Sequence, residues 1–176
     1  MLAILLEVLV FAGVMIVDLV SKALIMPYLL KQPSQSFAVW DNIIHFTYAE
    51  NYGASFGIFN GKTGLLLAIT GIAMALVLIA LIFLNQKPKL LRYGLILLLG
   101  GGLANLVDRI SLGYVRDFID YRFLSTWFNI DFAIGNMADI FCIVGVILMA
   151  VYIIFDYKEG DLSMRFKRVK LCKPKQ

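Results

Sequence analysis

Charge is scarce in this sequence, and its scarcity excludes most classes of soluble protein. Only 16% of the 176 residues are Asp, Glu, Lys or Arg, whereas soluble domains carry about 25%. Hydrophobic residues make up 61% of the chain, and the mean hydropathy is +0.84. Because a membrane span needs roughly 20 apolar residues, the chain has room for four spans. We therefore expect residues 1–176 to form a single membrane domain.

The groups that several enzyme classes depend on are also missing. His45 is the only histidine, and the chain has no His-Glu-x-x-His or Gly-x-x-x-x-Gly-Lys sequence. These absences argue against zinc peptidases and nucleotide-binding enzymes. Gly53-Ala-Ser-Phe-Gly57 has the spacing of a serine hydrolase motif, but no histidine stands beside a serine or cysteine, which argues against that class. No residue pattern calls for a metal or a cofactor, and no basic patch with interleaved aromatic residues points to nucleic acid. Cys142 falls in an apolar run and Cys172 in a basic tail, so we expect no disulfide.

Four apolar runs fit membrane-spanning helices, and the charges beside them predict an orientation. The runs cover residues 3–24, 63–86, 90–107 and 132–155. Segment 86–92 holds three basic residues and the chain from residue 156 holds seven, so ten of the sixteen lie on one side. The positive-inside rule makes that side cytoplasmic. The sequence therefore predicts a multi-pass protein of the cell membrane, with both termini and the basic tail 161–176 in the cytoplasm.

Between the first two spans, residues 37–60 predict a small β element. Large apolar side chains alternate with smaller or polar ones over residues 44–49, which is typical of a strand with two different faces. Gly53 and Gly57 then suit turns or a close approach of the backbone. The expected fold class is an all-α membrane protein of four transmembrane helices, with a small extracytoplasmic β element lying on the membrane surface.

Polar and charged side chains gather at the outer ends of these spans. A bilayer penalises each such group by several kcal/mol unless it is paired or lines a wet cavity. The residues are Asp18 and Lys22 in the first span, Asn105, Asp108 and Arg109 at the end of the third, Asp117 beyond it, and Asn136 and Asp139 at the fourth. Because all of them lie at one predicted depth, the sequence indicates a functional site near the outer face.

We interpret Asp117 and Asp139 as a catalytic pair. Two neighbouring carboxylates in a low-dielectric site share a proton, so one can draw a proton from water while the other protonates the carbonyl oxygen or the leaving amine. This chemistry hydrolyses an amide without a covalent intermediate. Which aspartate acts as the base is left open. The groups available to orient the carboxylates or stabilise the oxyanion are Asn51, Asn105, Arg109 and Asn136.

The remaining ionisable residues receive supporting roles. Asp18 and Lys22 stand four residues apart on one helix face, so they can form an ion pair that holds the first span and the β element in place. Asp108, adjacent to Arg109, is expected to make a structural ion pair. Glu7 has no evident role and is placed near the opposite interface.

Two other functions compete with a peptidase. Intramembrane aspartates also mark ion pathways, so a small transporter or proton relay is an alternative. A relay favours acids spread through the membrane depth, however, and here they gather at one side, without an inverted repeat. A membrane scaffold that uses the basic tail is a second alternative, but it has no need for two buried carboxylates.

Five motifs, in order, resemble those of lipoprotein signal peptidase (signal peptidase II). They are Asp18-x-x-x-Lys22, Asn51-Tyr-Gly-Ala-Ser-Phe56, Gly101-Gly-Leu-Ala-Asn-Leu-Val-Asp-Arg109, Val115-Arg-Asp-Phe118 and Asn136-Met-Ala-Asp139. Each motif alone is weak, but all five at these spacings cover nearly the whole chain. A similar sequence just upstream, Phe128-Asn-Ile-Asp131, lacks the alanine and does not open directly into an apolar span.

The resemblance implies an aspartyl endopeptidase of the bacterial cytoplasmic membrane. Its substrate would be a prolipoprotein that already carries diacylglycerol on a cysteine, cleaved just before that cysteine. The resemblance assigns catalysis to Asp117 and Asp139, and substrate binding or support to Asn51, Gly53, Asn105, Arg109, Asn136, Asp18 and Lys22. Membrane lipids are the other expected partners. We expect a monomer with no cofactor, and one of the two outer segments acting as a lid.

Overall fold

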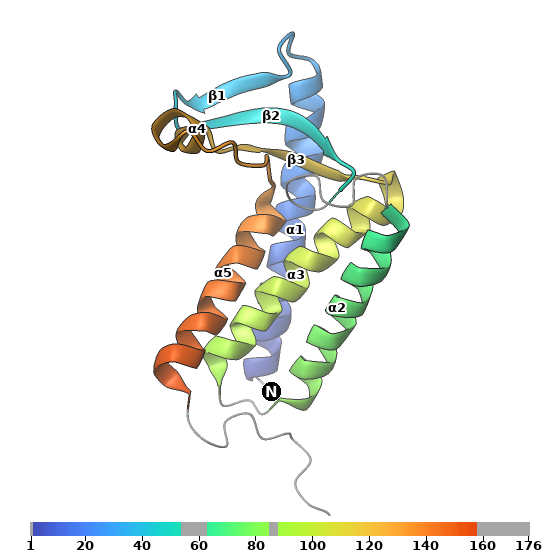
Figure 1. Cartoon of the computed structure of the whole chain (residues 1–176). Coiled ribbons are helices and arrows are strands. Elements are labelled where there is room, and N and C mark those ends of the chain that lie inside the picture. Colours follow the sequence, from blue (N-terminus) through green and yellow to red (C-terminus); the bar gives the residue numbers. More distant parts are fainter. Residues whose placement is uncertain (1, 54–62, 85–87, 158–176) are drawn as a thin grey trace, which may run out of the picture.

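Four long helices form a bundle beneath a small sheet in the computed structural model (Figure 1). The structure describes residues 2–53, 63–84 and 88–157. The helices are α1 (Leu2–Leu30), α2 (Thr63–Phe83), α3 (Lys89–Leu112) and α5 (Met137–Val151), the last continued by the π-helical turn η2 (Tyr152–Asp156). Each is long and apolar enough to cross a membrane. The predicted fold class is confirmed, although α1 runs past residue 24 and the last span begins at Met137 rather than at residue 132.

α3 lies at the centre of the bundle and packs against the other three helices. Its backbone approaches α5 so closely that a Cβ atom on Gly101 would lie 2.5 Å from the carbonyl oxygen of Ala138. Farther along the same contact, a Cβ atom on Gly94 would lie 2.7 Å from the carbonyl oxygen of Gly145. Small residues are the usual means of such close packing in a membrane, where lipid tails leave no hydrophobic force between helices. The contact sets the position of the first turn of α5 relative to α3.

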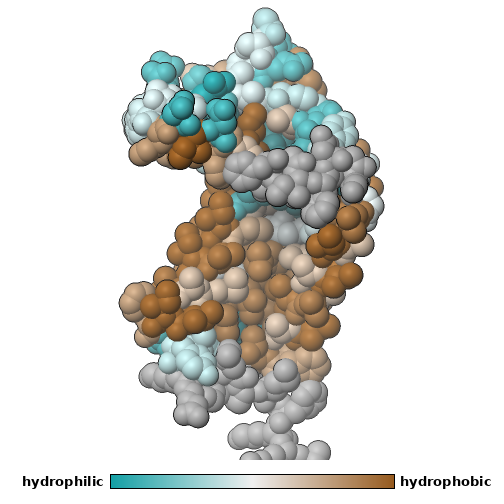
Figure 2. All heavy atoms as spheres, viewed as in Figure 1, coloured by the Kyte–Doolittle hydropathy of each residue, from teal (hydrophilic) through white to brown (hydrophobic). Residues whose placement is uncertain are grey.

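The outward faces of the helices are apolar along most of their length. Figure 2 shows hydrophobic residues covering the bundle and hydrophilic residues gathered at the sheet end. Exposed aliphatic side chains occur on every long helix, for example Ile16, Ile72 and Ile147. A bilayer removes the cost of exposing such side chains to water. The fold is therefore that of a multi-pass membrane protein.

The sheet has three antiparallel strands in the order β1 (Ser36–Trp40), β2 (Ile44–Asn51) and β3 (Val115–Asp120). A short helix, α4 (Arg122–Phe128), follows β3. The sequence predicted only the first outer segment as β, which was incomplete, because β3 comes from the second outer segment. Residues 54–60 of the predicted element lie outside the described residues, as do residues 161–176 of the basic tail.

The sheet is held on α1 by an apolar cluster. Met26 and Leu29 of α1 are buried against Phe118 and Ile119 of β3. The rings of Phe46 and Phe118 meet edge to face with centroids 5.2 Å apart, which is a favoured aromatic geometry. Because Phe118 and Ile119 follow Asp117 directly, this cluster also fixes the strand that carries the first aspartate.

Candidate active site

Asp117 is placed by the register between β2 and β3. Ala49 pairs with Asp117 and Asn51 pairs with Val115, so the side chains of Asn51 and Asp117 share one face of the sheet. Nδ2 of Asn51 donates a hydrogen bond to Oδ2 of Asp117 at 2.9 Å. The Asp117 side chain is buried, with 1% of the residue exposed. A backbone bridge from Gly135 to Ile119 then brings the start of α5 beside this strand.

Asp139 is placed by the first turn of α5. Asn136 is the N-cap residue, and its side chain accepts a hydrogen bond from the Asp139 backbone N–H at 3.1 Å. In return, the Asp139 carboxylate accepts a hydrogen bond from the Asn136 backbone N–H at 3.0 Å. This reciprocal arrangement is a capping box, which satisfies two helix-end donors. The sequence Asn-x-x-Asp therefore does more than supply a carboxylate, because it also sets where that carboxylate points.

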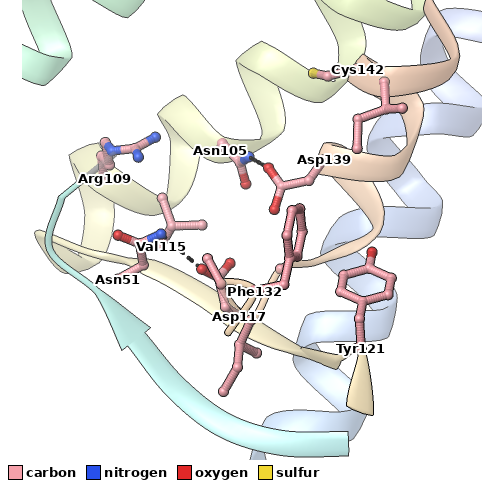
Figure 3. Close-up of a pocket in the computed structure, with 13 residues that line it drawn as sticks. Asn51, Asn105, Arg109, Val115, Asp117, Tyr121, Phe132, Asp139 and Cys142 are labelled. Atoms are coloured by element: carbon pink, nitrogen blue, oxygen red, sulfur yellow. Dashed lines mark hydrogen bonds between the residues drawn. The ribbon is translucent and has the colours of Figure 1, made fainter. Parts of the chain in front are cut away.

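The side chains of Asn136 and Asn105 connect the two aspartates, and Figure 3 shows the link from Asn105 to Asp139. Nδ2 of Asn136 donates to Oδ1 of Asp117 at 2.6 Å and to Oδ1 of Asn105 at 3.1 Å. Nδ2 of Asn105 in turn donates to Oδ1 of Asp139 at 2.9 Å. Asp117, Asn136, Asn105 and Asp139 thus form one continuous hydrogen-bonded chain. Both carboxylates receive hydrogen bonds from neutral donors, which hold them in position without adding positive charge.

A cavity of about 240 Å³ lies between these groups. Asp117, Asp139, Asn51, Asn105 and Arg109 line it together with apolar side chains. Figure 2 shows hydrophilic surface in the hollow between the sheet and the helices. Sequence analysis missed several lining residues, which are Val115, Tyr121, Phe132, Ala133, Ile134, Gly135, Cys142 and Ile143. The strand propensity of Val115, Phe118 and Ile119 was a signal for β3, but nothing in the sequence pointed to Tyr121 or Phe132.

The electrostatics of the cavity favour a shared proton. Burial, followed by the negative charge of Asp139, raises the pKa of Asp117 to about 7. Hydrogen bonds from Asn51 and Asn136 act in the opposite direction, because they stabilise the charged carboxylate. Asp117 therefore exchanges its proton near neutral pH.

Arg109 closes one end of the cavity. Its Nη2 donates to the carbonyl oxygen of Gly53 at 2.9 Å, and the Gly53 backbone N–H donates to Oδ1 of Asn51 at 3.0 Å. In Figure 3, Arg109 and Asn51 lie on the same side of the cavity. Arg109 thus holds the end of β2 in place while its positive charge faces the cavity that contains both aspartates.

Asp18 and Lys22 lie behind the cavity, with both side chains fully buried. Nζ of Lys22 lies 2.7 Å from Asp18 and 3.2 Å from Asp108, and it donates to Asn105 at 2.8 Å. Asp18 accepts a hydrogen bond from the Ala138 backbone N–H at 2.8 Å. The predicted ion pair is present. Among the described residues the pair joins α1 to α3 and α5, and Asp108, which also pairs with Arg116 of β3, links it to the sheet.

Asp108 makes the structural ion pairs that were expected, with partners that the sequence did not identify. Its carboxylate pairs with Lys22 and with Arg116 of β3, whose Nη2 lies 2.6 Å away. Glu7 lies at the other end of the bundle and pairs with Arg92 of α3 at 2.7 Å. The upstream sequence Phe128-Asn-Ile-Asp131 is separate from the site, because Asp131 is exposed and does not line the cavity.

All nine residues that the sequence assigned to the site lie together. Asp117, Asp139, Asn51, Asn105 and Arg109 line the cavity, and Gly53, Asn136, Asp18 and Lys22 support it. Within residues 2–53, 63–84 and 88–157, no group of three His, Cys, Asp or Glu side chains is placed to hold a metal ion. The arrangement is suited to proton transfer between water, two carboxylates and a bound amide.

Comparison with known proteins identifies the family. The family described as signal peptidase (SPase) II matches residues 10–155, which include every residue of the site. The chain belongs to the signal peptidase II family. A lipoprotein signal peptidase from Caldanaerobacter subterraneus is 37% identical over 148 residues, covering 84% of this chain and 95% of the relative. One from Clostridium acetobutylicum is 34% identical over 158 residues, covering 89% and 99%.

A solved structure shares the fold as well. A bacterial membrane enzyme determined at 2.3 Å resolution superposes with a TM-score of 0.73 and 30% sequence identity, covering 93% of this chain and 94% of that one. A second, determined at 1.9 Å, gives a TM-score of 0.71. Signal peptidase II family membership therefore agrees with the bundle-and-sheet architecture.

Proposed function

We propose that this chain is an aspartic endopeptidase that removes the signal peptide from diacylglyceryl-modified prolipoproteins, cleaving just before the lipidated cysteine. The observation that carries the proposal is the hydrogen-bonded chain from Asp117 through Asn136 and Asn105 to Asp139 within one cavity. The names of the relatives supply the substrate class. The paired carboxylates provide the acid and base that hydrolysis of a peptide bond in this substrate requires.

The reaction begins with one aspartate ionised and the other protonated. The ionised carboxylate takes a proton from water as the water oxygen forms a bond to the scissile carbonyl carbon. The protonated aspartic acid gives its proton to the carbonyl oxygen, which yields a neutral tetrahedral diol. In the second step the C–N bond breaks as the first aspartic acid protonates the leaving amine, and one diol hydroxyl returns its proton to the second aspartate. Both carboxylates finish in their starting states.

The depth of the cavity suits a lipidated substrate. A cysteine that carries diacylglycerol keeps its acyl chains in the bilayer, so the peptide bond beside it lies near the membrane surface. The cavity lies where the ends of α3 and α5 meet the sheet, and Ile143, which is 51% exposed on a membrane-spanning helix, forms part of its lining. We place this end at the outer face and both termini in the cytoplasm, as the basic residues indicate.

Cleavage of a purified, diacylglyceryl-modified prolipoprotein tests the proposal. Wild type, Asp117→Asn and Asp139→Asn are compared on a gel, with the unlipidated precursor as the control substrate. Each variant should lose roughly 10²–10⁴-fold in rate, the usual contribution of general acid–base catalysis, while its thermal unfolding shows that it remains folded. Cleavage by either variant at the wild-type rate would show that the aspartates are not the catalytic pair.

A further inference from the structure

The side-chain amides around the aspartates are occupied in holding the carboxylates. Nδ2 of Asn136 donates to Asp117 and to Asn105, which uses both of its N–H bonds. Asn51 donates to Asp117, and Asn105 donates to Asp139. Amide hydrolysis also builds negative charge on the carbonyl oxygen, and that charge needs a donor aimed at it. Asn136 therefore has no N–H left for this second task, and Asn51 and Asn105 each use one of their two N–H bonds on a carboxylate.

Tyr121 brings a further donor to the same cavity. It follows β3 directly, and its side chain lines the cavity together with Asp117 and Asp139. In Figure 3 its hydroxyl points toward the side of the cavity where Asp139 lies. Among the residues that the structure describes, no group accepts a hydrogen bond from this hydroxyl. A substrate oxygen in the cavity could accept it.

The ring of Tyr121 packs against Phe132, and its backbone is held by the first turn of α4. Phe132 meets it edge to face, with ring centroids 5.6 Å apart and an interplanar angle of 84°. The carbonyl oxygen of Tyr121 accepts a hydrogen bond from the Leu124 backbone N–H at 3.0 Å, so the first turn of α4 anchors its backbone. A donor that is already in position costs no reorganisation when charge develops.

The hydroxyl stays protonated under the conditions in which the aspartates work. Burial raises the pKa of Tyr121, and the negative charges of Asp139 and Asp117 raise it further. Tyr121 is therefore a neutral donor throughout the neutral pH range. Arg109, at the other side of the cavity, is a charged donor that already binds Gly53. The two residues can be told apart, since Tyr121→Phe leaves the charge of the cavity unchanged, whereas replacing Arg109 removes a positive charge that interacts with both aspartates.

We propose that the hydroxyl of Tyr121 is a catalytic group that donates a hydrogen bond to the scissile carbonyl oxygen as negative charge develops on it. The inference rests on the proposed peptidase function. The O–H bond of Tyr121 stays intact, and the protons that move are those of water, the two aspartates and the leaving amine. Removal of the hydroxyl should slow the chemical step without altering the protonation of the aspartate pair.

The test is the steady-state kinetics of Tyr121→Phe on diacylglyceryl-modified prolipoprotein across a range of pH. This substitution removes one oxygen atom and leaves the ring that packs against Phe132. We expect kcat to fall about 100-fold, the lower end of the effect of removing one oxyanion donor, with KM and the pH of half-maximal rate unchanged. Tyr28→Phe is the matched control, because it removes the same atom from an exposed residue outside the cavity, and it should behave as wild type.

The outcomes separate this inference from the function on which it rests. A wild-type kcat in Tyr121→Phe would overturn the inference alone. A rise in KM without a change in kcat would also overturn it, because the hydroxyl would then bind the ground state and the transition state equally. A shift in the pH profile would show that Tyr121 acts through the aspartates instead. Failure of the wild-type protein to cleave the substrate would overturn the proposed function, and this inference with it.

Discussion

Lys22 and Asn105, which stand 83 residues apart in the chain, are joined by a hydrogen bond of 2.8 Å from Nζ to Oδ1. Because Oδ1 of Asn105 accepts from Lys22, its Nδ2 is left to face Asp139. The same nitrogen lies 2.7 Å from Asp18 and 3.2 Å from Asp108. A buried cation outside the cavity therefore determines which way a cavity-lining amide points.

Replacing Lys22 should destabilise the fold. Lys22→Met leaves the fully buried Asp18 carboxylate without its counter-ion, and breaking a buried pair costs roughly 3–5 kcal/mol. Thermal unfolding in detergent measures the loss. Lys31→Met, on an exposed lysine at the end of α1, is the control and should have little effect. Adding Asp18→Asn to Lys22→Met should restore part of the stability. An unchanged melting temperature in Lys22→Met would contradict the role of this ion pair.

Cleavage should slow at alkaline pH. A pair that needs one proton loses it as pH rises through the pKa of Asp117, which is about 7. The hydrogen bond from Asn51 favours the charged carboxylate and lowers this pKa. Its loss in Asn51→Ala should therefore raise the pKa and move the alkaline fall in rate to higher pH. The pH dependence of kcat checks this, and Asn42→Gly, in the turn before β2, should leave the profile in place. If the alkaline decrease in rate moved to lower pH in Asn51→Ala, the proposed effect of this hydrogen bond on Asp117 would be contradicted.

A side chain added to α3 at its closest contact with α5 should disrupt the packing of these two helices. A Cβ atom on Gly101 would lie 2.5 Å from the Ala138 carbonyl oxygen, so Gly101→Val should push α5 away from α3. That displacement would lengthen the hydrogen bond between Asn105 and Asp139. Gly71→Val is the matched control, since nothing lies within 4 Å of a Cβ atom there. We expect Gly101→Val to lower both the melting temperature and the cleavage rate, whereas Gly71→Val should change neither. Equal effects of the two substitutions would count against this packing.

The ion pair between Glu7 and Arg92 should contribute to stability without contributing to catalysis. Arg92 is 4% exposed and donates to Glu7 through Nε and Nη2, both at 2.7 Å. Glu7→Gln should cost roughly 3–5 kcal/mol of stability, because it leaves a buried guanidinium without its counter-ion. A double-mutant cycle with Arg92→Met measures the coupling between the two side chains. The kcat of folded Glu7→Gln should equal that of wild type, and a large fall in kcat would show that the pair acts on the site.

Several features followed from the sequence because they depend on local patterns. The long apolar runs determined the four spans, since only a helix satisfies its own backbone within a bilayer. The gathering of polar residues at the span ends indicated the site, because a bilayer makes each such group costly. Asn136-Met-Ala-Asp139 carried the geometry of its own capping box, since both partners lie within one helical turn.

Other features were decided only by the tertiary structure. β3 and the apposition of Asn51 and Asp117 depend on pairing between segments 66 residues apart, and strand propensity does not specify a partner. The partners of Glu7 and Asp108 depend on which helix faces meet, which the packing of α1 against α3 determines. Tyr121 and Phe132 line the cavity because β3 and the start of α5 are joined at Gly135. The sequence by itself determined which carboxylates the protein has and at which end of the spans they gather. Tertiary packing decided what surrounds them, because contacts between distant segments leave no mark on the local pattern.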